Sequence, residues 1–385
     1  MRIIIYNSSS FGGCFDYGKA LLSAYRKHPD VEQASWWVPQ NAELDKDDAV
    51  RRLFLTDKPK SPSRILKQWH FLLRTILNPL LLLQRLSVQP QSVVIFNDFE
   101  QLSAGIWVPL FRWILGTKHR FVIVLHDPDR DAYPPSLRFT NWSMKTMMGL
   151  MDVAVFHDFL PDKIYYRNLP ECTFLDLPHG FYPMPEPDPE LLTELLKLES
   201  PGRIILTIPG NIREEKNYDL AIEALSRLPE HILIIAGSAS NARVDIQQYK
   251  NLATRLSVSE RVIWIEKFLT EAELSAVIEI CDVVVLNYAV SFTSQSGILN
   301  VVAPFRKELI VSDGPSSLAS VLKKFKVGEL VEPGSVDSLV EGLKRLSAEE
   351  AEVRHNWEDY LSYASWENHV NKAMDCYSKL KPMAR

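Results

Sequence analysis

The feature that most constrains the fold of this chain is the alternation of short β-rich runs with longer helical patterns. The segments between the runs carry apolar residues at helical spacing, as in "FDYGKALLSAYRKH" (15–28). Strands joined through helices of this length run parallel, and a parallel sheet is covered by helices on both faces. In the first half the expected strands are "RIIIYN" (2–7), "ASWWV" (34–38), "SVVIFN" (92–97), "RFVIVLH" (120–126), "DVAVFH" (152–157) and "CTFLDL" (172–177).

A proline-rich segment, "FYPMPEPDPELLTELLKLESPG" (181–202), interrupts this alternation. Closely spaced prolines stiffen a chain and prevent it from continuing as a strand, so we expect a domain linker here. The alternation then starts again, with expected strands at 203–209, 231–237, 261–266, 282–288, 308–313 and 328–333.

The fold class that follows is α/β, with two tandem Rossmann-like doubly wound domains. Such an arrangement places a deep cleft between the domains, at the carboxyl ends of both sheets, where parallel α/β domains bind ligands. We expect a first domain at 1–182, a linker at 183–202 and a second domain at 203–347, with helices at 348–385 that pack back on the first domain. The charged segment 40–63 is expected to be a mobile surface loop.

Length and composition agree with this architecture and exclude several classes of protein. A chain of 385 residues exceeds the usual size of one core, and 46% hydrophobic with 24% charged residues is typical of a soluble globular protein. The net charge of −5 argues against a nucleic-acid partner, and four scattered cysteines fit reduced cytoplasmic thiols. The start "MRIIIYNSSSFGG" is expected to be a strand rather than a signal peptide, and no apolar run is long enough to span a membrane.

The stretch "TIPGNIREEKNYDLAIEAL" (207–225) places two cations after an expected strand and just before a helix. Arg213 and Lys216 stand three residues apart, a spacing that can bring both to one side of a turn. With the N–H groups of the helix start, they could hold a diphosphate. The alternative is that both are solvated basic residues beside Glu214 and Glu215.

A second stretch, "SFTSQSGILN" (291–300), also follows an expected strand and carries no charge. Gly297 removes a side chain where phosphates could approach the backbone, and the neighbouring hydroxyl and amide groups do not repel an anion. Taken alone, Ser296 could simply be the N-cap of a helix. Because both stretches follow strand ends of one sheet, a shared anion site is the sharper hypothesis.

The order of these motifs resembles that of GT-B glycosyltransferases of the family 4-like retaining type (glycosyl transferases group 1). The resemblance covers most of the chain and is densest in 203–346. In the first half the motifs are "SSSFGGCFDYGKAL", "VIVLHD" and "LPHGFYP"; in the second half they are "GNIREEKN", "ILIIAGSAS", "CDVVVLNY", "TSQSGIL" and "GELVEPGSVDSLVEGLKRL".

This resemblance implies a hexosyltransferase-type enzyme (EC 2.4) that moves a sugar from a UDP- or GDP-linked donor to a glycan or lipid-linked acceptor. It implies retention of configuration, no metal and no cofactor, in polysaccharide or glycoconjugate biosynthesis, in the cytoplasm or at the inner face of the membrane. The donor would bind mainly to the second domain and the acceptor to the first. The implied donor-binding residues are Gly12, Gly13, Gly210, Asn211, Arg213, Lys216, Gly237, Phe268, Tyr288, Ser294, Gln295, Ser296, Gly297 and Asn300.

The implied catalytic pair is His126 and Asp127, at the end of "RFVIVLHD". A hydroxyl nucleophile needs its proton removed or its attack oriented, and His or Asp can do either. Since the donor phosphate is commonly argued to take the proton in retaining members, a positioning role for His126 stays open beside a base role. His157 and His179 also end strands and are more simply explained as structural histidines, although His179 could reach the cleft.

Departures from the family pattern leave a second function open. Many relatives carry two glutamates here, one of which grips the ribose, whereas this chain has Ser and Gln in the block and Asn300 at the later position. A non-catalytic GT-B relative that binds a nucleotide or a partner is therefore the alternative. An epimerase or phosphorylase of similar architecture is a further class, but the phosphorylase would need a much longer chain.

Two further features have competing explanations. Asp127, Asp129 and Asp131 have the spacing of a divalent-ion site in GT-A transferases, or form a charged loop that ends a strand. Segment 64–88 places Arg64, Lys67, Arg74 and Arg85 among leucines, Trp69 and Phe71. It could lie on an anionic membrane, or pack on the first sheet with its arginines in water.

Overall fold

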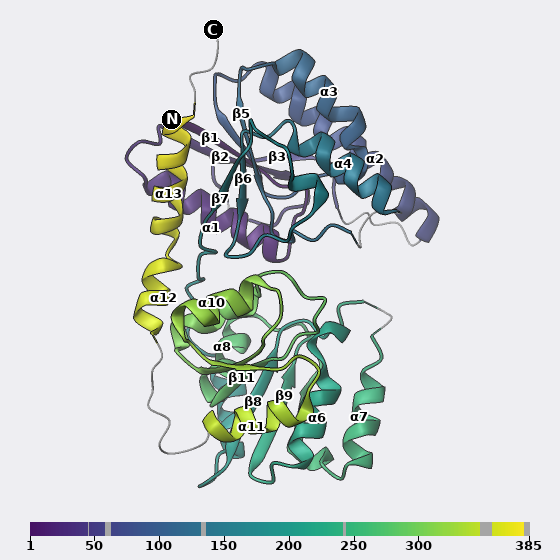
Figure 1. Cartoon of the computed structure of the whole chain (residues 1–385), viewed down its shortest axis with the longest axis vertical. Helices are drawn as coiled ribbons and strands as arrows, with labels where there is room; N and C mark the ends of the chain where they lie inside the picture. Colours follow the sequence, from purple (N-terminus) through teal and green to yellow (C-terminus); the bar gives the residue numbers. More distant parts are fainter. Residues whose placement is uncertain (45, 58–62, 132–135, 242–243, 347–355, 381–385) are drawn as a thin grey trace. The chain divides into compact units, whose positions relative to one another are not determined.

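The computed structural model describes residues 1–44, 46–57, 63–131, 136–241, 244–346 and 356–380. The chain forms two compact units (Figure 1). The first unit consists of Met1–Gly180 with Ser365–Arg385, and the second unit consists of Phe181–Ala364.

The first unit is built on a seven-stranded parallel sheet with the order β3-β2-β1-β4-β5-β6-β7. The central strands are almost continuously apolar because both of their faces are covered. The strands are β1 (Arg2–Tyr6), β2 (Gln33–Pro39), β3 (Val50–Phe54), β4 (Val93–Phe96), β5 (Arg120–Val124), β6 (Val153–Phe156) and β7 (Thr173–Asp176).

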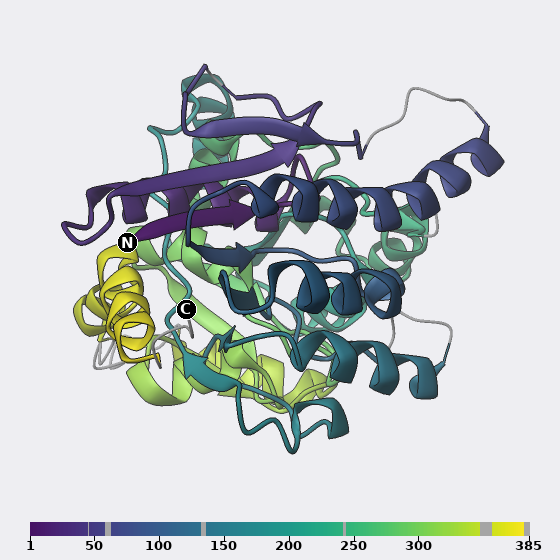
Figure 2. The ribbon, with the colours of Figure 1, turned by 90° about the horizontal axis from the view of Figure 1, so that it is seen from above.

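Helices cover both faces of this sheet, and each face has its own core. α1 (Gly13–Lys27) and α13 (Trp366–Lys379) pack on one face around Tyr17, Tyr25 and Tyr377. The other face is covered by α2 (Arg64–Ser87), α3 (Ala104–Leu115) and α4 (Leu137–Met148). Figure 2 shows these three helices side by side. Short 3₁₀ turns occur at Gln101–Ser103 and Ile164–Tyr166.

The second unit repeats this plan with a six-stranded parallel sheet in the order β10-β9-β8-β11-β12-β13. Its strands are β8 (Ile204–Pro209), β9 (His231–Ala236), β10 (Val262–Ile265), β11 (Val283–Leu286), β12 (Glu308–Ser312) and β13 (Glu329–Val331). α6 (Tyr218–Ser226), α7 (Ile246–Arg255) and α11 (Val336–Leu346) cover one face. α5 (Pro189–Leu195), α8 (Glu271–Ile280), α9 (Gly297–Val302), α10 (Ser317–Phe325) and α12 (Trp357–Tyr363) cover the other.

The prediction of two doubly wound parallel domains is confirmed. In each sheet the strand order reverses once, between β1 and β4 in the first unit and between β8 and β11 in the second. Ligands of open α/β sheets bind outside the carboxyl ends of the strands at such a switch point. The loops after these four strands are therefore where a site is expected.

Two expectations about local structure are wrong. Segment 40–63 is not only a loop, because Val50–Phe54 forms the edge strand β3; its Arg51 and Arg52 side chains are exposed, and charge is common on edge strands. Residues 45 and 58–62 of that segment lie outside the described residues. Segment 183–202 is not a bare linker, because α5 lies in it and packs on α8. Asp188 accepts a hydrogen bond from the N–H of Leu191 as its N-cap, followed by Pro189 at the first helical position.

The C-terminal segment divides between the units. α12 belongs to the second unit, whereas α13 packs on α1 in the first. Trp366 of α13 lies directly over Gly180, where an added Cβ would be 2.2 Å from the indole ring. Within the described residues, no helix is both long and apolar enough to cross a membrane.

Candidate functional site

The loops after β8 and β11 are joined by backbone and amide hydrogen bonds at the switch point of the second unit. The Asn217 Nδ2 group donates to the carbonyl of Asn287 at 2.9 Å, and the Asn287 Nδ2 group donates to the carbonyl of Asn217 at 3.2 Å. The N–H of Ala289 also donates to the carbonyl of Glu215 at 2.8 Å. These bonds hold the "GNIREEKN" loop against the chain that leads to "SFTSQSG". Sequence reasoning missed both asparagines, although Asn217 lies within "GNIREEKN" and Asn287 within "CDVVVLNY".

Lys216 is the buried cation of this site. Its side chain is 3% exposed, and its Nζ donates to the carbonyl of Pro209 at 2.5 Å. Burial, and after it the charge of Arg213, lowers the pKa of Lys216 to about 7. Lys216 forms no ion pair with any of the described residues, whereas Arg213 is exposed. A buried ammonium without a counterion favours an anionic ligand, because an anion would offset the desolvation of the charged form.

Two glycines allow the backbone to approach this cation closely. Gly210 has φ +84°, and an added Cβ would lie 2.8 Å from Ile298 Cδ1 and 3.5 Å from Lys216 Nζ. Gly237, at the end of β9, lies so near that its Cβ would be 2.2 Å from the carbonyl oxygen of Gly210. The structure thus brings Gly210, Lys216 and the first turn of α9 together. Asn211 is exposed beside them.

The loop before α9 is fixed by an aromatic pair. Tyr288 is buried, its ring stacks on Phe292 with centroids 4.0 Å apart, and its hydroxyl lies 3.0 Å from Ser296 Oγ. Ser296 Oγ is used by this contact and makes no N-cap hydrogen bond, so the simple capping explanation does not hold. An added Cβ at Gly297 would meet no atom within 4 Å, so the backbone there is open.

Gln295 is the unusual side chain of this loop. Both its Nε2 and its Oε1 atoms are buried, and neither has a hydrogen-bond partner among the described residues. A buried amide with both ends unsatisfied is costly, and such groups usually bond to water or a ligand. Ser294, next to it, is partly buried.

Two of the expected donor-binding residues, Asn300 and Phe268, differ sharply in burial. Asn300 is fully buried, and its Oδ1 accepts a hydrogen bond of 2.7 Å from the Tyr360 hydroxyl of α12. This side chain is engaged inside the unit. Phe268 follows β10, at the edge of the sheet, and is 79% exposed.

The serine loop after β1, in the first unit, is occupied by the chain's own carboxylates. Asp98 accepts hydrogen bonds from the N–H of Ser8 and, at 3.0 Å, from that of Ser9. Asp57 accepts from the N–H of Ser10 at 2.8 Å and from its Oγ at 2.6 Å. Burial raises the pKa of Asp98, although these donors oppose the rise. Sequence reasoning missed both aspartates.

Gly12 and Gly13 follow this serine loop and remain open. Both are exposed, and an added Cβ at either would meet no atom within 4 Å. Gly12 has φ +82° and precedes α1, which has no side-chain N-cap hydrogen bond.

His126 is held as a neutral donor. Its Nε2 lies 2.8 Å from Asn97 Oδ1, which can only accept, so Nε2 carries the proton. Asn97 is oriented in turn, since its Nδ2 donates to Asn7 Oδ1 at 2.9 Å. Burial, followed by the charge of His157, lowers the pKa of His126 to about 3. This imidazole is a poor base near neutrality and suits positioning better. Asp127 is half-buried beside it.

His126 is one of four histidines that gather around the Tyr17 ring. The ring centroids of His126, His157, His179 and His369 lie 4.5, 5.6, 5.1 and 5.9 Å from that of Tyr17. Burial lowers the pKa of His157 to about 4 and that of His369 to about 3, and it also lowers the pKa of His179. Sequence reasoning missed Tyr17 and His369, which meet although 352 positions separate them.

The aspartates that could have formed a metal site are paired with a lysine. The Nζ of Lys163 lies 2.8 Å from Asp129 and 2.6 Å from Asp131. Although burial opposes the charge, these hydrogen bonds raise the pKa of Lys163. In the part of the chain that the structure describes, no cluster of three or more His, Cys, Asp or Glu side chains could hold a metal ion.

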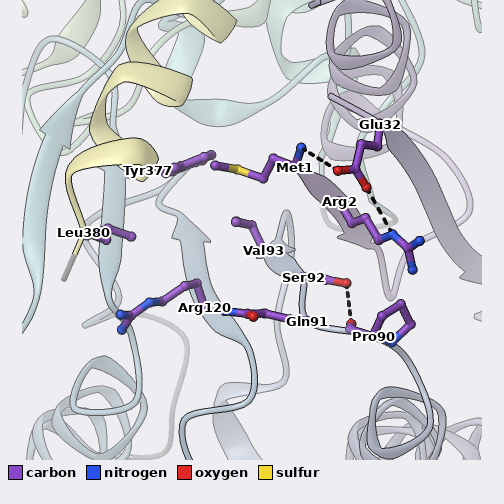
Figure 3. Close-up of a pocket in the computed structure, with 10 residues that line it drawn as sticks. All are labelled: Met1, Arg2, Glu32, Pro90, Gln91, Ser92, Val93, Arg120, Tyr377 and Leu380. Atoms are coloured by element: carbon purple, nitrogen blue, oxygen red, sulfur yellow. Dashed lines mark hydrogen bonds and ion pairs between the residues drawn. The ribbon is translucent and has the colours of Figure 1, made fainter. Parts of the chain in front are cut away.

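A surface pocket of about 440 Å³ lies at the amino ends of the strands of the first sheet, whereas the loops described above follow the carboxyl ends (Figure 3). It is lined by the beginnings of β1, β4 and β5, including Arg2, Val93 and Arg120, and by Tyr377 of α13. Its cations are already paired, Arg2 with Glu32 and Arg120 with Asp152. None of the expected site residues lines it, and the amino ends of parallel strands are not where such sheets bind ligands.

Comparison with known proteins defines the class. Residues 197–361 match the family model described as glycosyl transferases group 1. This part of the chain, which contains the Lys216 loop and the "SQSG" loop, is therefore a glycosyl transferases group 1 domain. No curated protein sequence matches the chain.

Solved structures extend the fold assignment to both units. A sucrose-phosphate synthase from Thermosynechococcus elongatus is similar over 98% of this chain and 98% of its own, at 14% identity and TM-score 0.72. HepE of Anabaena in complex with UDP matches at 12% identity and TM-score 0.68, over 99% and 100% of the chains. WaaG, a glycosyltransferase involved in lipopolysaccharide biosynthesis, matches at 15% identity and TM-score 0.61, over 98% and 100%. The predicted GT-B fold of two parallel α/β domains is confirmed, and residues 197–361 of the second unit match glycosyl transferases group 1.

Proposed function

We propose that this enzyme transfers a hexose from a UDP- or GDP-linked donor to a glycan or lipid-linked acceptor, with retention of configuration and without a metal. The reaction would serve polysaccharide or glycoconjugate biosynthesis on the cytoplasmic side of the membrane. The observation that carries the proposal is the buried Lys216 ammonium, which has no carboxylate partner among the described residues and adjoins Gly210 and the start of α9. HepE, a similar structure, is in complex with UDP.

Lys216 and Arg213 would act on the leaving group. As the glycosidic bond breaks, negative charge builds on the departing diphosphate, and fixed cations in a water-poor site stabilise that charge. The open backbone at Gly210 and Gly297 would let the phosphates approach. The unsatisfied amide of Gln295 can both donate and accept, so it would bond to the donor without repelling it.

His126 and Asp127 would orient the acceptor hydroxyl. With its pKa lowered to about 3, His126 stays neutral in the physiological range and offers a fixed dipole rather than a strong base. Proton removal by the donor phosphate agrees with this limit. A metal is not needed to neutralise the diphosphate, since two cations of the chain would do so.

Donor binding and donor hydrolysis test the proposal together. Lys216→Met should weaken binding of UDP-glucose or GDP-mannose and slow hydrolysis of whichever donor binds, while the exposed Lys197→Met serves as the matched control. Equal binding by both variants would contradict the diphosphate assignment.

A non-catalytic role is the second candidate, and Asn300 favours it. A ribose-gripping glutamate is expected at that position, but the asparagine is buried and bonded to Tyr360. Tight donor binding with no hydrolysis, and with no transfer to any acceptor tried, would support this candidate over the enzyme.

A further inference from the structure

The outer face of helices α2, α3 and α4 carries an unusual number of exposed apolar side chains. Trp113 is 82% exposed, Ile65 65%, Trp69 61% and Trp142 53%. We call this surface the α2–α4 face. It comprises Ile65, Leu66, Trp69, Phe71, Leu72, Leu73 and Leu77 of α2, Ile106, Trp113 and Ile114 of α3, and Leu137 and Trp142 of α4.

The beginning of α2 contributes most of this surface. From Ile65 to Leu73 every residue except His70 is exposed, so this part of the helix is not amphipathic with respect to its own domain. In Figure 2 it projects beyond the ends of α3 and α4. The later part of the helix is packed in the ordinary way, with Leu82, Leu83 and Leu86 buried. Packing of the domain therefore explains the apolar residues of the second half of α2 and not those of the first.

The three helices form one continuous surface. α3 packs between α2 and α4, and the ring of Trp142 lies over Gly105 of α3, where an added Cβ would be 2.1 Å away. A larger residue than glycine would displace this tryptophan. Contiguous exposed apolar patches on soluble domains mark interaction sites.

The three helices that form the α2–α4 face carry formal charge of one sign. The three helices contain no Asp or Glu but seven cations, in a chain whose net charge is −5. Five of these cations are exposed and form no ion pair with the described residues: Lys67, Arg85, Arg112, Arg138 and Lys145. Arg74 is half-buried and donates to the carbonyl of Ser8.

These charges distinguish between possible occupants. A second copy docking through the same face would place cations against cations, which disfavours a symmetric dimer. An anionic lipid surface satisfies both properties at once, because phosphates attract the cations and the acyl region accepts the aliphatic and indole side chains. Tryptophan is the residue enriched at such interfaces, and three exposed tryptophans lie on this face.

We propose that the α2–α4 face docks the enzyme on an anionic phospholipid bilayer. The face lies in the first unit, the one proposed to receive the acceptor. An enzyme docked on a bilayer through this unit would meet lipid-linked acceptors, which makes them the expected substrate class. This last step rests on the proposed function, which assigns the acceptor to the first unit.

Vesicle sedimentation of the full chain tests this proposal. We expect binding to phosphatidylcholine vesicles that contain phosphatidylglycerol, weaker binding to phosphatidylcholine alone, and loss of the difference at high salt, where the charges are screened. The triple variant Arg112→Glu, Arg138→Glu, Lys145→Glu should bind anionic vesicles at least a hundredfold more weakly, from roughly fivefold for each cation lost. Trp69→Ala with Trp113→Ala should weaken binding to both kinds of vesicle.

A matched control reverses three exposed cations of the second unit: Lys197→Glu, Arg203→Glu and Arg255→Glu. This control should bind vesicles like the unaltered protein. Binding of UDP-glucose and GDP-mannose, measured without vesicles, should be the same in all variants. An error in the proposed donor site would therefore appear in this measurement and not in vesicle binding. Equal loss in the control and the face variant would overturn the proposal. So would a dimer in solution that the Trp69→Ala, Trp113→Ala variant dissociates.

Discussion

The two units of this protein have the same switch-point geometry and opposite chemistry. In the second unit, the loops after β8 and β11 surround a buried cation, Lys216, that has no counterion among the described residues. In the first unit, the loop after β1 is filled by two carboxylates of the chain, Asp57 and Asp98, which take the N–H groups of Ser8, Ser9 and Ser10. The fold places a potential anion site in both units, and carboxylates of the chain fill the serine loop of the first.

This comparison explains how two domains of the same architecture can differ in whether they bind a donor phosphate. An anion of the chain already occupies the serine loop, so a donor phosphate would meet repulsion there. The Lys216 loop instead presents a cation, which would attract a donor phosphate. A fold specifies where ligands bind, and function follows from the residues grafted on it.

Removing the cation should have the largest effect. Lys216→Met should lower the rate of donor hydrolysis roughly a hundred- to a thousandfold, the size seen when one group that stabilises developing charge is lost. The variant should remain folded, because replacing an unpaired buried charge by an apolar side chain of similar volume relieves its desolvation. The rate constants and the thermal midpoint are the measurements. A folded variant with unchanged rates would show that Lys216 does not act on the donor, and the contrast between the two units would not hold.

Changing an aspartate of the first unit should act on stability instead. Asp98→Asn keeps an acceptor but loses charge-assisted bonds to the serine loop, which should lower the free energy of unfolding by about 1–3 kcal/mol. Binding of UDP-glucose or GDP-mannose by the second unit should not change. Urea unfolding and donor titration check the two halves of this prediction. A variant of normal stability with impaired donor binding would show that the serine loop has a direct role.

The histidine cluster should make the first unit sensitive to acid. The folded-state pKa values of His157 and His369, about 4 and about 3, lie below the ordinary value of 6.5. Between these values the unfolded chain binds more protons, so stability is full above about pH 6.5 and falls as the pH falls toward 4. His157→Phe should reduce the drop in thermal midpoint between pH 7 and pH 5 by roughly 2–4 °C. An identical drop in the variant would show that acid acts elsewhere.

Chelation should have the smallest effect. Since two cations of the chain are proposed to neutralise the diphosphate, adding EDTA should leave donor hydrolysis unchanged. A loss of activity that is restored by Mg²⁺ or Mn²⁺ would instead support a metal site, and Asp127 with its neighbours would be the first candidates.

The fold was largely predictable because apolar runs and helical spacing report burial directly. Strands with a continuous apolar run, such as β1 and β11, were predictable, whereas the charged edge strand β3 was not. An edge strand needs only one partner and one apolar face, so its sequence carries a weak signal. Helix α5 was not predictable from the proline spacing, because proline is typical both of a linker and of the first turn of a helix.

The site was predictable at the level of motifs and not of contacts. Arg213, Lys216 and Gly210 come from one stretch, so their proximity follows from local spacing. The meeting of Asp98 with Ser8, or of His369 with Tyr17, depends on sheet order and on the return of the C-terminal helix. Nothing in the local sequence encodes such contacts. Asn300 is a further example. It belongs to a recognised motif, but the motif did not indicate that its side chain would accept a hydrogen bond from Tyr360.

Proton uptake on donor binding tests the central claim most directly. At pH 7 a group with its pKa at about 7 is half protonated, and a bound diphosphate should raise that pKa. Calorimetric titration with UDP-glucose and GDP-mannose, in two buffers of different ionisation enthalpy, should show uptake of roughly half a proton by the donor that binds. Lys216→Met should show none. Binding enthalpies that are the same in both buffers, or uptake that persists in Lys216→Met, would contradict the account.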